Sequence, residues 1–133
     1  LGAWYHATKH ALEGWSDSLR LELAAFGIHV VLIEPGLIGT EFGDVMLAPM
    51  LERSGQGPYG QMAQRMAEAS QANYDKPGAS SPPSVITNLI LQAIRSPRPK
   101  PRYAGGKLAK PMLFLRWLLS DRLFDRAVMS QVK

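Results

Sequence analysis

The sequence predicts an α/β protein with a doubly wound parallel sheet, and two adjacent segments carry this prediction. Over residues 7–26, apolar residues recur at the spacing of one helical face; they are Leu12, Trp15, Leu19, Leu23 and Phe26. Gly27 ends this helix, and residues 28–33 form a short, nearly continuous apolar run. Such a run is typical of a strand buried on both faces of a parallel sheet, and Pro35-Gly36 ends it. A helix that leads into a buried strand is half of a βαβ unit.

Length and composition limit the chain to one globular domain. Its 133 residues can bury one modest core, and a content of 46% hydrophobic and 20% charged residues excludes disordered and collagen-like proteins. The absence of cysteine excludes disulfides and thiolate zinc sites, and favours an intracellular, cytoplasmic protein. Glu34 interrupts the best apolar stretch, so we expect no membrane-spanning helix. Because position 1 is Leu and no signal peptide follows, we expect the chain to be part of something longer.

Later segments add two helices, a short strand and a basic end. A helix is expected over residues 61–74, with Met62 and Met66 on one face. Ser81 is a candidate N-cap for a second helix whose apolar face comprises Val85, Ile86, Leu89, Ile90, Ala93 and Ile94. The proline-rich connector 97–101 leads into a strand at 102–104. An amphipathic basic helix is expected near the end, with Met112, Leu115, Leu118 and Leu119 apolar.

The net charge of +4 hides an asymmetry between the two ends of the chain. Residues 1–94 carry 5 Lys and Arg against 9 Asp and Glu, whereas residues 95–133 carry 10 against 2. A basic stretch can meet nucleic acid or anionic lipid, but most such stretches are solvated surface. We predict no nucleic-acid partner and a weak membrane-surface contact of the basic end.

The candidate catalytic residues are Tyr5 and Lys9, at the start of the first helix. Residues four apart share a helical face, so the phenol and the ammonium can meet. A phenol is protonated at neutral pH, and a fixed cation favours its phenolate form. Such a pair can transfer a proton to a carbonyl while a nicotinamide carries the hydride. Tyr103 and Lys107 have the same spacing, but the glycines between them oppose a helix.

These residues and their neighbours carry a family resemblance. The motifs are Tyr5 to Lys9, Ala11-Leu12-Glu13-Gly14-Trp15, Phe26-Gly27-Ile28-His29-Val30, and Ile33-Glu34-Pro35-Gly36 with Thr40. Over about the first 40 residues the chain resembles the carboxyl-terminal half of a short-chain dehydrogenase/reductase. The residues of these motifs are most similar to those of the hydroxysteroid and retinol dehydrogenase branch. The fold implied by the resemblance is a Rossmann-type doubly wound parallel sheet, of which only the carboxyl-terminal half is present.

The resemblance implies a role for each matching residue. Tyr5 would be the catalytic acid and base, and Lys9 would assist it and hold the ribose hydroxyls of NAD or NADP. The cofactor-binding loop would comprise Pro35, Gly36, Ile38 and Thr40, with the Ile38 backbone on the carboxamide and the Thr40 hydroxyl beside it. The helix over residues 5–26 would pack against a twin in a homodimer or homotetramer. The family's glycine-rich dinucleotide loop and catalytic serine are missing from these residues, so we expect no activity from the fragment alone.

We therefore interpret residues 1–133 as the carboxyl-terminal part of one Rossmann-type oxidoreductase domain. Residues 1–42 would hold the catalytic helix, strand and nicotinamide loop, residues 43–81 a substrate lid, and residues 82–133 the last helix, short strand and basic tail. The predicted reaction interconverts an alcohol and a ketone or aldehyde on a small hydrophobic substrate.

Two other interpretations remain open at this stage. The stretch from Arg95 to Lys133 could make the chain a non-catalytic membrane-surface or interaction module, and the chain could also be an inactive truncated relic. In the membrane-surface alternative, the residues that would dock on anionic lipid are the cations Lys107, Lys110, Arg116, Arg122 and Arg126, beside the apolar Met112, Phe114, Trp117 and Leu118. His6 and His10 lie four apart, but no acidic residue occupies the helical position that a metalloprotease would need, so no metal site is predicted.

Overall fold

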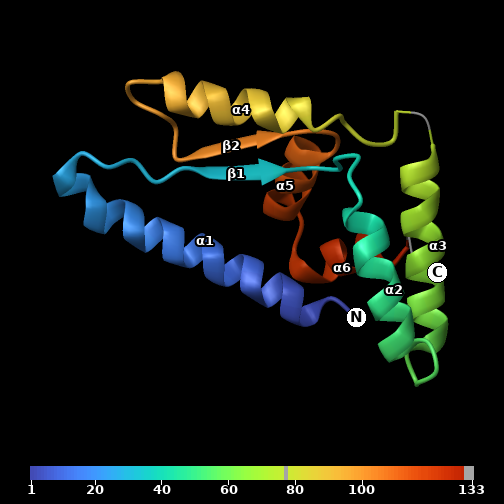
Figure 1. The fold of residues 1–133 in the computed structure, drawn as a ribbon. Helices are drawn as coiled ribbons and strands as arrows, with labels where there is room; N and C mark the ends of the chain where they lie inside the picture. The colour runs from blue at the N-terminus through green and yellow to red at the C-terminus, as the bar shows by residue number, and fades with distance from the viewer. Residues whose placement is uncertain (77, 131–133) are drawn as a thin grey trace.

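A computed structural model describes residues 1–76 and 78–130, and it contains helices around a two-stranded sheet (Figure 1). The elements in chain order are α1 (Ala3–Leu23), the 3₁₀ helix η1 (Ala24–Phe26), β1 (Leu32–Pro35), α2 (Phe42–Ser54), α3 (Gly60–Asp75), α4 (Ser84–Arg95), β2 (Arg102–Gly105), α5 (Ala109–Leu118) and α6 (Asp121–Met129). The α4 helix lies on one side of the sheet and α1 on the other, while α2 and α3 stand beyond the carboxyl end of β1. The chain is therefore an α/β protein, as predicted.

The sheet is parallel, and its register places Ile33 opposite Tyr103 and Pro35 opposite Gly105. The strand predicted at residues 28–33 begins later, at Leu32. Extending the register backwards would set residues 28–31 against the proline-rich connector 97–101, where Pro99 and Pro101 have no N–H to donate. β1 is not buried on both faces as predicted, because Leu32, Ile33 and Glu34 are half-buried and Pro35 is exposed. The described residues pair this strand on one edge only.

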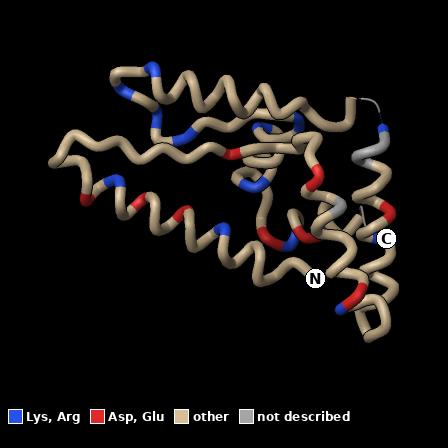
Figure 2. The backbone as a smooth tube through the Cα atoms, viewed as in Figure 1, with Lys and Arg blue, Asp and Glu red and all other residues tan. Residues whose placement is uncertain are grey.

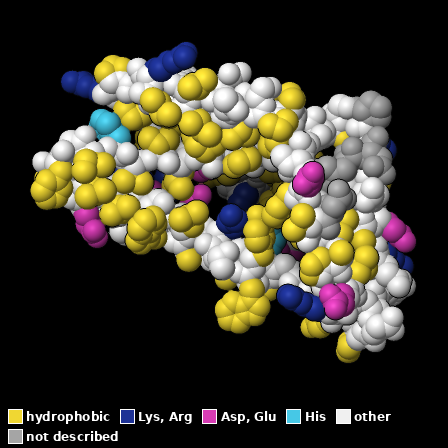
Figure 3. Space-filling view, in the orientation of Figure 1, with side chains coloured by type: hydrophobic (Ala, Val, Ile, Leu, Met, Phe, Trp, Pro, Cys, Tyr) yellow, Lys and Arg dark blue, Asp and Glu magenta, His cyan; other side chains and the backbone are white. Residues whose placement is uncertain are grey.

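The helix that carries Tyr5 and Lys9 turns its apolar side away from the sheet. Trp15 and Leu12 on this side are exposed, whereas the buried residue of α1 is Ser16. The predicted end of the helical segment at Gly27 is confirmed. Gly27 follows η1 and takes the left-handed conformation, with φ of 68°. Figure 3 shows apolar side chains spread over the surfaces of α1 and α4.

The core of the described residues is small. Its buried apolar residues are Leu47 on α2, Ala63 on α3, Tyr103 on β2 and Ala109 on α5. No large side chain among the described residues is fully buried. The chain therefore leaves much apolar surface uncovered, as expected when a sheet is incomplete.

One local prediction is wrong, and one helix was not predicted. Ser81 is not the N-cap of α4, because Pro83 occupies that position and Ser81 is engaged instead with residues 37–39 and 107. The helix α2 was not anticipated, since Pro49 inside it and the glycines around it argue against a regular helix. The predicted helix over residues 61–74 and strand over residues 102–104 match α3 and β2 within a residue at each end.

Gly36 sets how closely the end of β1 approaches the residues after β2. A Cβ at this position would lie 2.2 Å from the Lys107 carbonyl oxygen and 2.7 Å from the Ala109 nitrogen. Both neighbours are backbone atoms that are themselves held by hydrogen bonds, so they cannot move aside freely. Glycine is required here for space.

We predict that Gly36→Ala lowers the free energy of unfolding by at least about 2 kcal/mol, because its methyl group collides with backbone. Urea unfolding of the native protein, followed by circular dichroism, measures this. Gly14→Ala is the matched control: a Cβ there meets nothing within 4 Å, and α1 should gain about 0.5–1 kcal/mol. Equal stability of Gly36→Ala and wild type would contradict the packing described.

Candidate active site

The candidate loop lies between the carboxyl ends of both strands and Ser81. The Gly36 N–H donates to the Gly105 carbonyl at 2.8 Å, and the Leu37 N–H donates to the Lys107 carbonyl at 2.8 Å. On the other side, the Ser81 N–H donates to the Leu37 carbonyl at 2.8 Å and the Gly39 N–H to the Ser81 carbonyl at 2.9 Å. Backbone hydrogen bonds on both sides therefore hold the loop in place.

The position of Ile38 follows from these bonds. Within the part of the chain that the structure describes, backbone bonds engage the amides before and after it, and none engages the Ile38 amide. Its side chain packs under the turn after β2, where a Cβ on Gly106 would lie 2.6 Å from Ile38 Cδ1. Gly106 also has a φ of 89°, which favours glycine. The side chain of Ile38 is thus fixed, while its amide forms no backbone hydrogen bond with another described residue.

Tyr5 and Lys9 are brought together on the first two turns of α1. The Lys9 Nζ atom lies 5.2 Å from the centre of the Tyr5 ring, and the exposed fraction of Tyr5 is 44%. The hydrogen bond from the Thr8 hydroxyl to the Tyr5 carbonyl, at 2.7 Å, is local to the same turn. The phenol and the ammonium therefore share a solvent-accessible face.

Phe42 connects this pair to the loop. Its ring centre lies 5.8 Å from that of Tyr5, and its N–H donates to the Thr40 hydroxyl at 3.4 Å. The contact brings the first turn of α2 against the first turns of α1, so Thr40 and Tyr5 belong to one region. Phe42 was not predicted from the sequence, although an aromatic residue two positions after the loop was a usable signal.

The second tyrosine and lysine at the same spacing do not form a pair. Tyr103 is buried in the core on β2, and its hydroxyl accepts a hydrogen bond from the Lys100 N–H at 3.1 Å. The Lys107 ammonium instead donates to the Gly78 carbonyl. The helix, rather than the spacing, brings Tyr5 and Lys9 together.

Arg102 ties α1 to both strands. Its guanidinium reaches Glu13 Oε2 and Asp17 Oδ2 on α1, each at 2.9 Å, and Glu34 Oε1 on β1 at 3.1 Å. Figure 2 shows the acidic positions along α1 and the basic residues around the start of β2. This cluster was not predicted from the sequence, although a charged residue inside each short strand was a usable signal.

The cluster shifts the pKa values of its members in opposite directions. Hydrogen bonds from Arg102 and then Arg20 lower the pKa of Asp17 from 3.8 to about 2. Burial raises the pKa of Glu34 above its ordinary value, and repulsion from Glu13 adds to the effect. Hydrogen bonds to Asp17 and Glu13 raise the pKa of Arg102. The cluster therefore keeps its cation charged while Glu34 carries a desolvation cost.

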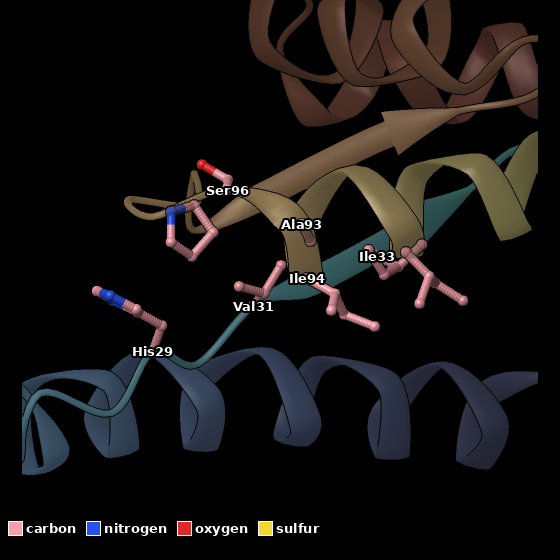
Figure 4. Close-up of a pocket in the computed structure, with 8 residues that line it drawn as sticks. His29, Val31, Ile33, Ala93, Ile94 and Ser96 are labelled. Atoms are coloured by element: carbon pink, nitrogen blue, oxygen red, sulfur yellow. The ribbon is translucent and has the colours of Figure 1, made fainter.

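An apolar hollow between β1 and α4 lies away from this region (Figure 4). Its lining residues are His29, Val31, Ile33, Ile90, Ala93, Ile94, Ser96 and Pro99. It lies beside the amino end of β1, whereas the first turns of α1 and the start of α2 lie beyond the carboxyl end. We do not assign it to the candidate site, because it has the character of sheet surface left uncovered.

The described residues contain neither a metal-binding cluster nor a helix that could span a membrane. No group of three or more histidines, cysteines or acidic residues there could hold a metal ion. No helix in the described part is long and apolar enough to cross a membrane. His10 Nδ1 instead lies within hydrogen-bonding distance of the His6 carbonyl, at 2.9 Å.

Comparisons with known proteins identify the family. The family model for short chain dehydrogenases matches residues 1–48. An uncharacterized oxidoreductase, YbbO of Escherichia coli strain K12, is 34% identical over 92% of this chain and 40% of its own length. Dehydrogenase/reductase SDR family member 9 of Bos taurus is 34% identical and retinol dehydrogenase 16 of Rattus norvegicus 32%, each over 92% of this chain and 42% of its own. The chain belongs to the short-chain dehydrogenase/reductase family.

The chain spans about two fifths of the length of these relatives. No solved structure matches it. The relatives align along most of the chain, well beyond the residues that the family model covers.

We predict that Arg102→Gln lowers the free energy of unfolding near neutral pH by roughly 1–2 kcal/mol, because three carboxylates lose their shared cation. The pKa of Asp17 is depressed, so its contribution to stability is present above pH 3.8 and is lost as the pH falls toward 2. Glu34 has the opposite sign, since protonation of its carboxyl as the pH falls relieves a desolvation cost. The deficit of the variant should therefore shrink in acid.

Urea unfolding of the native protein at several pH values tests this. Arg98→Gln is the matched control, because Arg98 is exposed and forms no ion pair with another described residue. A deficit of the same size at neutral and acid pH would show that Arg102 acts through packing rather than through its ion pairs.

Proposed function

We propose that the protein carrying this chain is an NAD- or NADP-dependent oxidoreductase that interconverts an alcohol and a ketone or aldehyde. The observation that carries the proposal is the Lys9 ammonium 5.2 Å from the centre of the Tyr5 ring, beside the loop that ends at Thr40. Membership of the short-chain dehydrogenase/reductase family supports it. Tyr5 and Lys9 are the catalytic residues of the proposal.

The groups at this edge fit a nicotinamide nucleoside. The Ile38 amide has no backbone partner among the described residues, and the exposed Thr40 hydroxyl follows two residues later. Pro35 and Gly36 would complete the cofactor-binding loop, and the Lys9 ammonium would donate to ribose hydroxyls. The donor set therefore suits a carboxamide and a ribose. When bound, the nicotinamide supplies the hydride, which no side chain can carry.

Proton transfer is the task of the chain's own residues. In the reduction direction the Tyr5 phenol donates its proton to the carbonyl oxygen of the substrate, and in the oxidation direction the phenolate accepts the alcohol proton. The Lys9 ammonium, on the same face of α1, would attract the negative charge that develops on the substrate oxygen and the phenol oxygen during the transfer. The Phe42 ring, at 5.8 Å, restricts the orientation of Tyr5 and shields one side of it from water.

A hydrophobic substrate is proposed from the segment 43–81. The pair α2 and α3 stands beyond the carboxyl end of β1, where the loop and Tyr5 lie, and Val45 and Met46 on α2 are exposed. These side chains would form a lid over an apolar substrate. The name of one relative, retinol dehydrogenase 16, supports an apolar alcohol as substrate class.

The same proposal includes a larger sheet. We infer that β1 and β2 belong to a Rossmann-type doubly wound sheet in the whole protein, with the domain divided at residues 1–42, 43–81 and 82–133. The uncovered apolar surface and the greater length of the relatives support this. Residues 1–133 contain no glycine-rich phosphate loop of the kind that binds dinucleotides.

We predict that Tyr5→Phe lowers kcat at least about 100-fold, because the proton donor is lost while the ring and its contact with Phe42 remain. The polypeptide is isolated from its source at its native length, and oxidation of NADH or NADPH is followed with apolar ketones and aldehydes. Tyr59→Phe, at an exposed tyrosine between α2 and α3, is the control. Unchanged turnover by Tyr5→Phe would exclude Tyr5 as the acid.

The exposed apolar side of α1 supports a homodimer or homotetramer through residues 5–26. Trp15 has an exposed fraction of 61% and shares this side with Leu12. We predict that Trp15→Glu shifts the native protein to a smaller species in analytical ultracentrifugation, because two copies would bury the new charges. Tyr59→Glu, on the loop before α3, should leave the mass unchanged. An unaltered mass for Trp15→Glu would place the interface elsewhere.

A further inference from the structure

The helix α5 presents an apolar stripe to solvent. Residues three and four apart share a helical face, and the stripe so defined comprises Lys110, Leu113, Phe114, Trp117 and Leu118. All five are exposed, with exposed fractions of 55% for Phe114 and 79% for Trp117. The rings of Phe114 and Trp117 lie 5.9 Å apart between centres, so they form one continuous surface.

The other side of α5 is attached to the fold. Ala109 is buried, and α5 packs against β2. The turn into the helix passes through Gly106 and Leu108, both with positive φ, and Leu108 is the single described non-glycine residue in that conformation. This backbone direction is held by Gly36, which packs against Lys107 and Ala109. The stripe therefore faces outward because its helix is fixed, and not because the helix end is loose.

The charges around the stripe are mostly positive. Residues 107–130 carry five Lys and Arg against two Asp. Arg116 pairs with Asp121 at 2.7 Å, and Lys107 is engaged by the Gly78 carbonyl. Lys110, within the stripe, and Arg122 and Arg126, one turn apart on α6, stay exposed. Lys133 of the predicted basic tail lies outside the described residues.

We propose that the α5 stripe docks on the surface of an anionic lipid bilayer. Aromatic and leucine side chains would enter the boundary between headgroups and acyl chains, and the flanking cations would meet anionic headgroups. Charge complementarity favours this occupant over a second copy of the chain, because two copies of the stripe would bring the same cations together. A helix of ten residues is about 15 Å long, which suits a helix lying along the surface.

Sedimentation with vesicles tests the proposal on the protein at its native length. Vesicles of phosphatidylcholine with phosphatidylserine should bind it, vesicles of phosphatidylcholine alone should bind it at least about tenfold more weakly, and added salt should weaken binding. Trp117→Ala should weaken binding to the anionic vesicles about tenfold or more. Lys110→Glu should weaken it at least about fivefold. The variants change exposed side chains, and circular dichroism checks that they remain folded.

Two matched controls separate the stripe from exposed residues elsewhere. Tyr59→Ala removes an exposed aromatic ring, and Arg65→Glu reverses an exposed cation on α3; both should bind vesicles as wild type does. Binding that is absent, or that Trp117→Ala and Lys110→Glu leave intact, would overturn the proposal. A decrease in oligomer mass caused by Trp117→Ala without vesicles would also overturn it, and would assign the stripe to contacts between copies.

Discussion

Arg102 is the contact through which the candidate catalytic helix is attached to the sheet. The apolar side of α1 faces solvent, so apolar packing of that side does not hold the helix to β1. Ion pairs from Arg102 to Glu13 and Asp17 on α1, and to Glu34 on β1, take this role. Ion pairs have stricter geometry than apolar contacts, so they determine the rotation of α1 about its axis. That rotation determines which side of the helix presents Tyr5 and Lys9.

A second constraint acts at the opposite end of the strands. Gly36 and Gly106 allow backbones to approach more closely than any side chain would permit. Ser81, far along the chain, then bonds to the loop on one side and to Lys107 on the other. Three separate segments thus meet at the carboxyl edge of the sheet, and the loop to Thr40 has one position. The ring of Phe42 contacts the ring of Tyr5 and so links Tyr5 to this loop.

The described basic residues from position 95 onward have different surroundings in the fold. Of the ten basic residues from 95 onward, Arg102 pairs with carboxylates of α1 and so supports the candidate catalytic helix. Others crowd the turn between α4 and β2, and a third group lies on α5 and α6 beside exposed aromatic rings. A count of charges along the sequence does not distinguish these three groups of basic residues. Their functions separate only when the chain is folded, because neighbours decide which cations remain free.

Local patterns were enough to determine the class of the fold, the helices at α1, α3 and α4, the strand at β2 and the candidate pair Tyr5 and Lys9. Helical periodicity, glycine and proline signals and a short motif act within a few residues, so they can be seen in sequence. The later start of β1, the role of Ser81 and the attachment of α1 by Arg102 could not be seen. Each depends on residues that are distant in the chain: Pro99 and Pro101 for the strand, Leu37 and Lys107 for Ser81, Glu13, Asp17 and Glu34 for Arg102. Tertiary structure alone decided these features, because pairing partners and ion pairs are set by which segments lie side by side.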